Sequence, residues 1–272
     1  MFYHTIERII HIDALIMGID VVRPKNFYFP GETHDFWEAV YVCDGNVTAT
    51  ADERVYRLSS GNLLFHKPME FHRIWTDEEN APHLMILSFK ASGNGMRRFE
   101  NSCFELSPSQ RKRLTEITAH FPPPPPTDDE IVQTDPLTLN RAAAMLETLL
   151  LDLMDRPEYS GHTMTGDESQ YARIVNVMKQ NCDRTLSVED LAQLCNLGVS
   201  NMKRIFACFS DVGIAKYFLS LKVRRAMELL DEGMPASKVA EALDFSEISY
   251  FYTVFKRETG MTPTQYKKSH PV

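Results

Sequence analysis

Cysteine is scarce in this sequence, and the spacing of the cysteines fits neither a disulfide framework nor a metal-binding motif. The five cysteines are scattered and odd in number, and no two of them form a pair separated by two residues. This argues against a disulfide framework and against a cysteine-based zinc site, and it indicates a reducing compartment. We therefore expect a cytoplasmic protein whose cysteines are ordinary, partly buried thiols.

Long hydrophobic runs are also missing. The most apolar stretch near the start, residues 9–22, contains His11, Asp13 and Asp20, so it is too short and too charged to span a bilayer. No basic segment followed by an apolar core opens the chain, and we expect no signal peptide. With 43% apolar and 24% charged residues, the 272 residues have the composition of a globular protein with room for two domains.

Charge is divided unevenly along the chain, whose net charge is −8. From Ser169 to the end there are 14 basic and 11 acidic residues, a balance of +3. The preceding part has 15 basic and 26 acidic residues, a balance of −11. An acidic front and a mildly basic back fit a nucleic-acid-binding domain at the C-terminal end.

Residues 1–100 contain short β-rich segments separated by Gly, Asn, Asp and Ser. This regular spacing predicts a small antiparallel barrel or sandwich. The expected strands are residues 39–43, 47–51, 55–58, 63–65 and 84–89.

Helical periodicity replaces the strands after residue 107. Ser107 and Pro108 begin a helix that reaches about residue 121, where prolines 122–126 end it and form a spacer. A second helix, over 136–156, carries an apolar stripe at alternating spacings of three and four. The stripe either packs on the barrel or pairs with a second copy of the chain. We assign 107–157 as a helical dimerisation segment and 158–168 as a linker. The stripe residues are Leu139, Ala142, Leu146, Leu149 and Leu153.

Two copies of one helical pattern occupy residues 169–272. In each copy a short helix that contains a small residue, Ala192 or Ala240, is followed by a turn and a second helix. Shared apolar positions would hold the second helix on a core, and its polar positions would then face the DNA major groove. This predicts a DNA-binding domain with two helix-turn-helix units. The aligned apolar pairs are Met202 with Phe251, Ile205 with Val254, and Phe206 with Phe255.

Polar positions on the second helix of each unit are the candidate DNA contacts. Lys203 and Arg204 lie where contacts to guanine or phosphate would be made. Thr253 and Glu247 leave the later helix poorly basic, so we expect weaker base readout there. The candidate DNA-binding residues are Ser200, Asn201, Lys203, Arg204, Ser249, Tyr250, Thr253 and Lys256.

Residues 170–269 resemble the DNA-binding domain of AraC-type (arabinose-regulator-like) transcription regulators. The resemblance is carried by VAEALDFS at 239–246, by SYF at 249–251, by FKR at 255–257 and by GMTPTQY at 260–266. It implies two helix-turn-helix units joined by one long helix, over about 214–231, that read adjacent major-groove segments. Gly198 departs from the Ser or Thr that usually caps the first recognition helix in this family.

The front of the chain resembles the cupin barrel, which is the usual effector domain of these regulators. The pattern runs from His34 through Glu38 to Gly45 and later reaches His72. In metal-binding cupins two histidines two residues apart, a glutamate and a later histidine hold the metal, and here Glu32 stands in place of the first histidine. The resemblance implies that Glu32, His34, Glu38 and His72 bind a small polar effector. We rank this effector ahead of a divalent metal at His34, Glu38 and His72, and expect no cofactor.

The sequence therefore predicts a multidomain α+β protein, a cupin-like antiparallel β-barrel followed by an all-α domain with two helix-turn-helix units. We expect a sequence-specific transcription regulator rather than an enzyme. Two alternatives stay open: a regulator that uses its barrel only to dimerise, and a metal-dependent cupin enzyme. The expected partners are double-stranded DNA, a small-molecule effector such as a sugar, a second copy of the chain, and RNA polymerase if transcription is activated. No membrane partner is expected.

Overall fold

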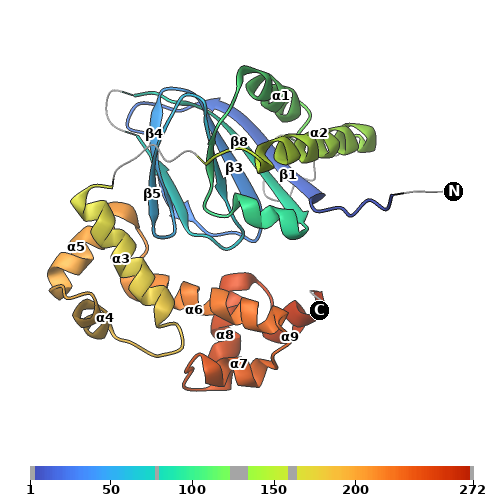
Figure 1. Ribbon diagram of the computed structural model, residues 1–272. Coiled ribbons are helices and arrows are strands. Elements are labelled where there is room, and N and C mark those ends of the chain that lie inside the picture. Colours follow the sequence, from blue (N-terminus) through green and yellow to red (C-terminus); the bar gives the residue numbers. More distant parts are fainter. Residues whose placement is uncertain (1–3, 77–79, 123–133, 159–163, 270–272) are drawn as a thin grey trace. The chain divides into compact units, whose positions relative to one another are not determined.

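The computed structural model describes residues 4–76, 80–122, 134–158 and 164–269 (Figure 1). The chain divides into two compact units, Met1–Ala51 with Val55–Thr163, and Asp52–Arg54 with Met164–Val272. Most of the predicted proline spacer, 123–126, and the middle of the predicted linker, 159–163, lie outside the described residues. No described helix combines the length and the apolar character needed to cross a membrane.

The first unit is built on two antiparallel sheets, as predicted. One has the strand order β1-β8-β3-β6-β9, and the other has the order β2-β7-β4-β5. The four strands β1, β2, β7 and β9 were not predicted, since β7 and β9 are very short and the long β1 carries polar and half-exposed side chains. The strands are β1 (His11–Val22), β2 (Tyr28–Glu32), β3 (Trp37–Asp44), β4 (Asn46–Ala51), β5 (Arg54–Ser59), β6 (Asn62–His66), β7 (His72–Trp75), β8 (His83–Ser92) and β9 (Cys103–Glu105).

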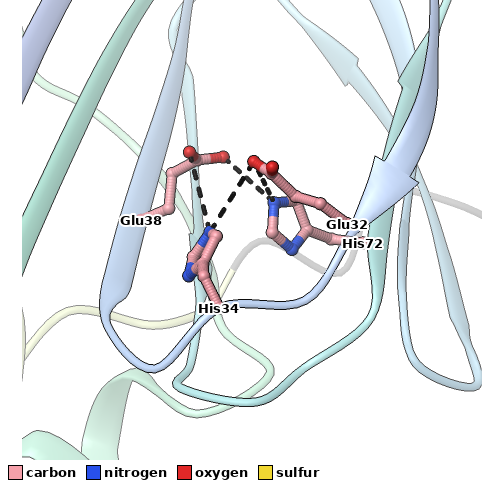
Figure 2. Close-up of side chains that lie close together, drawn as sticks. All are labelled: Glu32, His34, Glu38 and His72. Carbon is pink, nitrogen blue, oxygen red and sulfur yellow. Dashed lines mark ion pairs between the residues drawn. The ribbon is translucent and has the colours of Figure 1, made fainter. Parts of the chain in front are cut away.

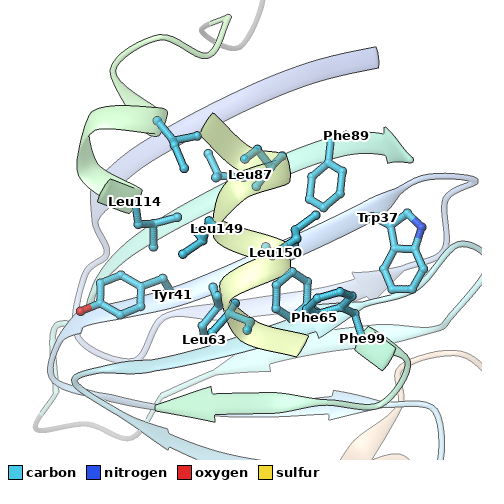
Figure 3. Packing of buried hydrophobic residues seen from close by; sticks show 14 of the residues in the cluster. Trp37, Tyr41, Leu63, Phe65, Leu87, Phe89, Phe99, Leu114, Leu149 and Leu150 are labelled. Atoms are coloured by element: carbon cyan, nitrogen blue, oxygen red, sulfur yellow. The ribbon is translucent and has the colours of Figure 1, made fainter. Parts of the chain in front are cut away.

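Successive side chains on the central strands point to opposite faces of the sheet, so they contribute to two separate apolar cores. On β3, Val40 and Val42 belong to the inner core between the two sheets, whereas Ala39 and Tyr41 belong to an outer core. The outer core joins the five-stranded sheet to two helices (Figure 3). Because both faces of β3 are covered, its first six residues are all buried, and the strand reads as a continuous apolar run.

The two helices on the outer core begin where the sequence predicts. Ser107 caps α1 (Pro108–Thr118) in a reciprocal capping box with Gln110, and Asp135 caps α2 (Pro136–Met154) with its carboxylate. A proline occupies the start of each helix, where its missing amide hydrogen costs nothing. These local signals are sufficient to place both N-termini.

The apolar stripe of α2 packs on the barrel. Leu146 and Leu149 are each 1% exposed, and Leu153 is fully buried, within the outer core. Figure 3 shows Leu149 and Leu150 of this helix among the core side chains. Of the two alternatives for the stripe, the structure therefore contains the first, and these leucines are not available as dimer contacts. The solvent-facing side of α2, where Leu151 is 47% exposed, is the part of this helix that a partner would have to use.

From Met164 onward the described residues form helices and turns. The first begins at Gly166, where Thr165 and Glu168 form a reciprocal capping box. The helices are α3 (Gly166–Gln180), α4 (Val188–Leu194), α5 (Val199–Phe209), α6 (Ile214–Asp231), α7 (Ala236–Ala242), α8 (Ile248–Thr259) and α9 (Pro263–Ser269).

Candidate nucleic-acid interface and effector cluster

Strand register places polar side chains at one end of the space between the two sheets. Glu38 has the same parity on β3 as the inner-core valines and pairs with His66 on β6 and with Ser88 on β8. Glu32 pairs with His72 across β2 and β7. The inner core is therefore apolar along most of its length and polar at this end, which is the arrangement that a ligand site requires.

Gly31 fixes the backbone next to Glu32. Its φ is +98°, and a Cβ atom there would lie 2.6 Å from the ring of Phe71 and 2.8 Å from the carbonyl oxygen of His72. Only glycine fits this conformation and this close approach. A register shift between Phe29 and Glu32 accompanies it, so the end of β2 is bent where Glu32 joins the cluster.

The four residues predicted to bind an effector come together (Figure 2). Their ligand atoms all lie within 4.8 Å of one another. Nε2 of His72 lies 3.4 Å from Glu38 and 3.9 Å from Glu32, and Nε2 of His34 lies 3.9 Å from Glu38 and 4.0 Å from Glu32. The His72 side chain is 1% exposed, whereas the Glu32 side chain is 48% exposed, so the cluster is buried at one end and open to solvent at the other.

Burial and mutual attraction set the ionisation of these groups. Burial lowers the pKa of His34 to about 4, assisted by the neighbouring His72. Burial would also lower the pKa of His72, but Glu38 outweighs it and the net shift is upward. Conversely, His72 outweighs the effect of burial on Glu38 and lowers the pKa of that carboxyl. Burial, together with Glu38, raises the pKa of Glu32.

His66 and Glu70 belong to the same region, although the sequence analysis did not select them. The His66 ring stacks on His72 with ring centroids 4.3 Å apart, and its Nδ1 lies 3.1 Å from the Glu70 carboxylate. Both side chains are fully buried. Their spacing in the sequence could have indicated them: His66 ends β6, His72 begins β7, and Glu70 lies in the short connection between these two strands.

In the second unit, the two helix-turn-helix turns have the same backbone geometry. Asn196 and Asp244 follow the first helix of each unit and adopt left-handed φ angles of 47° and 51°. The amide of the next residue then donates back across the turn to the carbonyl of the small alanine, the pattern of a Schellman cap. These bonds join Leu197 to Ala192 at 2.9 Å and Phe245 to Ala240 at 3.0 Å.

The second helix of each unit, α5 or α8, is anchored by the aligned apolar residues and exposes its polar ones. All six anchors are at most 2% exposed. The eight candidate DNA-binding residues are exposed. Thr253 and Ser249 are joined through a hydrogen bond from the Thr253 hydroxyl to the Ser249 carbonyl, 2.9 Å long. The anchors are Met202, Ile205, Phe206, Phe251, Val254 and Phe255.

Comparison with known proteins assigns both units to one family. Residues 191–269 match the family described as "Helix-turn-helix domain", and residues 21–163, more than half of the chain, match "AraC-like ligand binding domain". The chain belongs to the AraC family. It is a DNA-binding transcription regulator with an N-terminal ligand-binding domain, and the predicted family and fold are confirmed.

Curated relatives of this AraC-family regulator align over most of their length. The transcriptional activator RhaR of Mannheimia succiniciproducens is 22% identical over 251 residues, which is 88% of this chain and 87% of the relative. RhaR of Salmonella schwarzengrund is 23% identical over 248 residues, again 88% and 87%. Among solved structures, ToxT from Vibrio cholerae covers 94% of this chain and 100% of its own, with 12% identity and a TM-score of 0.39.

Arg204, one of the residues predicted to contact bases, forms an ion pair within this AraC-family regulator. The two terminal nitrogens of Arg204 contact the two carboxylate oxygens of Asp167 at 3.0 and 3.2 Å, and its Nε contacts Asn201 at 3.3 Å. This planar fork is the geometry with which arginine binds phosphate or guanine. Asp167 therefore occupies the part of Arg204 that a DNA contact would use.

We expect Asp167→Asn to tighten DNA binding about two- to fivefold, the range set by the small stability of an exposed ion pair. The substitution releases Arg204 and removes one negative charge near α5. Fluorescence anisotropy with a labelled duplex at fixed salt measures the change. Glu228→Gln is the matched control, because it breaks a similar pair with Arg225 on α6. Equal tightening by both variants would mean that only net charge matters.

Proposed function

We propose that this regulator changes its activity on DNA when a small polar ligand binds to Glu32, His34, Glu38 and His72. One observation carries the proposal: strand pairing places Glu32, Glu38 and His72 at the polar end of an otherwise apolar interior, and His34 joins them from the connection between β2 and β3. They lie in the unit that matches a ligand-binding family. A sugar is our candidate class of effector, since carboxylates and imidazoles can form hydrogen bonds with hydroxyl groups.

The ligand would control DNA binding through thermodynamic linkage. A ligand that binds one arrangement of the regulator more tightly shifts the population toward that arrangement, by no more than its difference in affinity for the two. On DNA, α5 would supply direct base readout through Ser200, Lys203 and Arg204, and α8 would supply weaker readout and phosphate contacts. This division follows from the greater positive charge of α5.

The further partners we propose are a second copy of the chain and RNA polymerase. The curated relatives are named as transcriptional activators, and an activator acts by contacting polymerase at the promoter. A dimer would have to use surface other than the buried stripe of α2, such as the face around Leu151. The chain would act in the cytoplasm, where a bacterial promoter is accessible.

The alternative functions are a regulator whose barrel only dimerises and a metal-dependent cupin enzyme. We favour effector control over the first, because a purely structural barrel gives no reason to bury His72 and Glu38 against each other at a cost in desolvation. We favour it over the second, because the curated relatives are regulators of nearly the same length.

We expect His34→Ala and Glu38→Ala to abolish the response to the effector while leaving DNA affinity within about twofold, since the side chains lie outside the DNA-binding unit. Thermal-shift screening of the full chain against a panel of monosaccharides identifies a ligand, and anisotropy with and without that ligand measures the response. His83→Ala is the control, because His83 pairs with Asp20 on the surface of the same unit. Loss of DNA binding in a folded variant would contradict the proposed separation of roles.

A further inference from the structure

The two helix-turn-helix units pack around different apolar cores. In the first unit the rings of Tyr171, Phe206 and Tyr217 pack against one another. In the second, Val223 and Leu230 lie in a core with the apolar side chains of α7 and α8. Both cores use α6, which runs from one unit to the other (Figure 1). A cavity of about 630 Å³ is bordered by residues of both units, so apolar packing does not fill the space between them.

Two hydrogen bonds join the units directly at Asp244, in the turn of the second unit. Thr185 lies in the connection between α3 and α4, just before the first unit. Its amide donates to the Asp244 carboxylate at 2.8 Å, and its hydroxyl donates to the Asp244 carbonyl oxygen at 2.7 Å. Hydrogen bonds from Thr185 hold the pKa of the Asp244 carboxyl below its usual range. The first bond is therefore charge-assisted, and such bonds are stronger than those between neutral groups.

A buried ammonium completes this connection. Lys222, on α6, is 4% exposed, and its Nζ donates to the Thr185 hydroxyl at 3.4 Å and to the Arg184 carbonyl oxygen at 3.1 Å. The Thr185 hydroxyl can accept from Lys222 and donate to Asp244 at the same time. The ring of Phe245 lies 5.0 Å from the same Nζ, within range of a cation–π contact. Because burying a charge is costly unless it is paired or hydrogen-bonded, these contacts form a built connection.

The equivalent turn of the first unit has no such connection. Asn196 adopts nearly the same left-handed φ angle as Asp244, 47° against 51°, and both residues are exposed. Among the described residues, the Asn196 side chain has no hydrogen-bond partner. The Asp244 side chain instead reaches Thr185, 59 positions away in the sequence. The turn itself therefore does not require the side-chain bond, and Asp244 acts beyond its own turn.

We propose that Thr185, Lys222 and Asp244, which we call the Asp244 bridge, fix the two recognition helices α5 and α8 at one separation. Successive major-groove segments on one face of DNA repeat about every 10–10.5 base pairs. A fixed separation then selects duplexes in which the two contacted segments are correctly spaced. Asp244 is a positioning residue, because it sets this spacing without contacting a base. The inference uses the proposed DNA contacts of α5 and α8 and does not depend on the effector cluster.

The test compares two variants that remove the same charge. Asp244→Gly keeps the left-handed turn and loses the carboxylate. Asp244→Asn also tolerates this φ angle and keeps an oxygen that can accept from the Thr185 amide. Selection from random-sequence DNA with the full chain supplies a duplex, and hydroxyl-radical footprinting locates the segments that it contacts. One base pair is then added or removed between them.

The measured quantity is the ratio of affinity for the selected duplex to affinity for the two altered ones. Asp244→Gly is expected to lower this ratio about two- to tenfold, the range for loss of one hydrogen bond, whereas Asp244→Asn should keep it within about twofold. Asn196→Gly, the control at the equivalent turn, should keep the ratio of the parent. Thr185→Val removes the hydroxyl of the bridge and should lower the ratio as Asp244→Gly does, which provides a second test if the glycine variant does not fold.

Three outcomes would contradict the bridge in variants that thermal unfolding shows to be folded. They are an unchanged ratio in Asp244→Gly and Thr185→Val, an equal loss in Asp244→Asn and Asp244→Gly, or an equal loss in Asn196→Gly. Footprinting of the parent separates this failure from that of the proposed DNA contacts. Protection of a single groove segment would contradict the shared contact of α5 and α8, and the bridge with it. Two protected segments with an unchanged ratio would contradict the bridge alone.

Discussion

Leu149→Ala is expected to lower the free energy of unfolding of the first unit by about 3 kcal/mol. Leu149 is 1% exposed in the outer core between α2 and the five-stranded sheet, so its truncation leaves a cavity that the sheet cannot close. Both tryptophans of the chain, Trp37 and Trp75, lie in the first unit. Urea unfolding followed by tryptophan fluorescence therefore reports on this unit without a contribution from the DNA-binding one.

Leu151→Ala is the matched control on the same helix. Its side chain is 47% exposed, and the change should alter the free energy of unfolding by less than about 0.5 kcal/mol. A third variant, Leu151→Asp, tests the dimer. If the outer face of α2 joins two copies, Leu151→Asp should give monomers in sedimentation with unchanged unfolding. Equal destabilisation at 149 and 151, or a parent that is already monomeric, would refute this account of α2.

Arg204→Ala is expected to weaken binding to a specific duplex about 5- to 150-fold more than binding to a scrambled one, the range for loss of a bidentate base contact. Arg204 is exposed on α5, two residues before the buried anchor Phe206. Lys256→Ala should weaken both duplexes alike, because Lys256 follows the anchor Phe255 near the end of α8, where phosphate is the expected contact. Selection from random-sequence DNA with the full chain supplies the specific duplex.

Equal losses on both duplexes for Arg204→Ala would identify Arg204 as a backbone clamp. Base readout would then have to lie on α8, around Ser249 and Tyr250, despite the lower charge of that helix. Combining Arg204→Ala with Asp167→Asn adds a check. If Asp167 acts only by occupying Arg204, its substitution should have no effect once the arginine is removed.

Local chemistry in the sequence was sufficient to predict the helical part of this protein. The Ser107 and Ser187 caps and the prolines at helix starts act within a few residues of themselves. The paired turns depend on Asn196 and Asp244 together with the alanines a few positions earlier. Because both the signal and the structure are local, two helix-turn-helix units could be predicted, and the family with them.

Only the tertiary structure decided what covers each surface and which distant residues meet. The sequence shows that one face of α2 is apolar, but not whether a barrel or a second copy buries it. Nor does the sequence indicate which residues far apart in the chain will pair, such as Arg204 with Asp167 or Glu32 with His72. Those pairings follow from helix packing and from strand register, and in a strand a shift of one residue would turn every side chain to the opposite face. For this reason the family pattern selected four cluster residues, while their orientation, and the part played by His66, emerged only when the strands were paired.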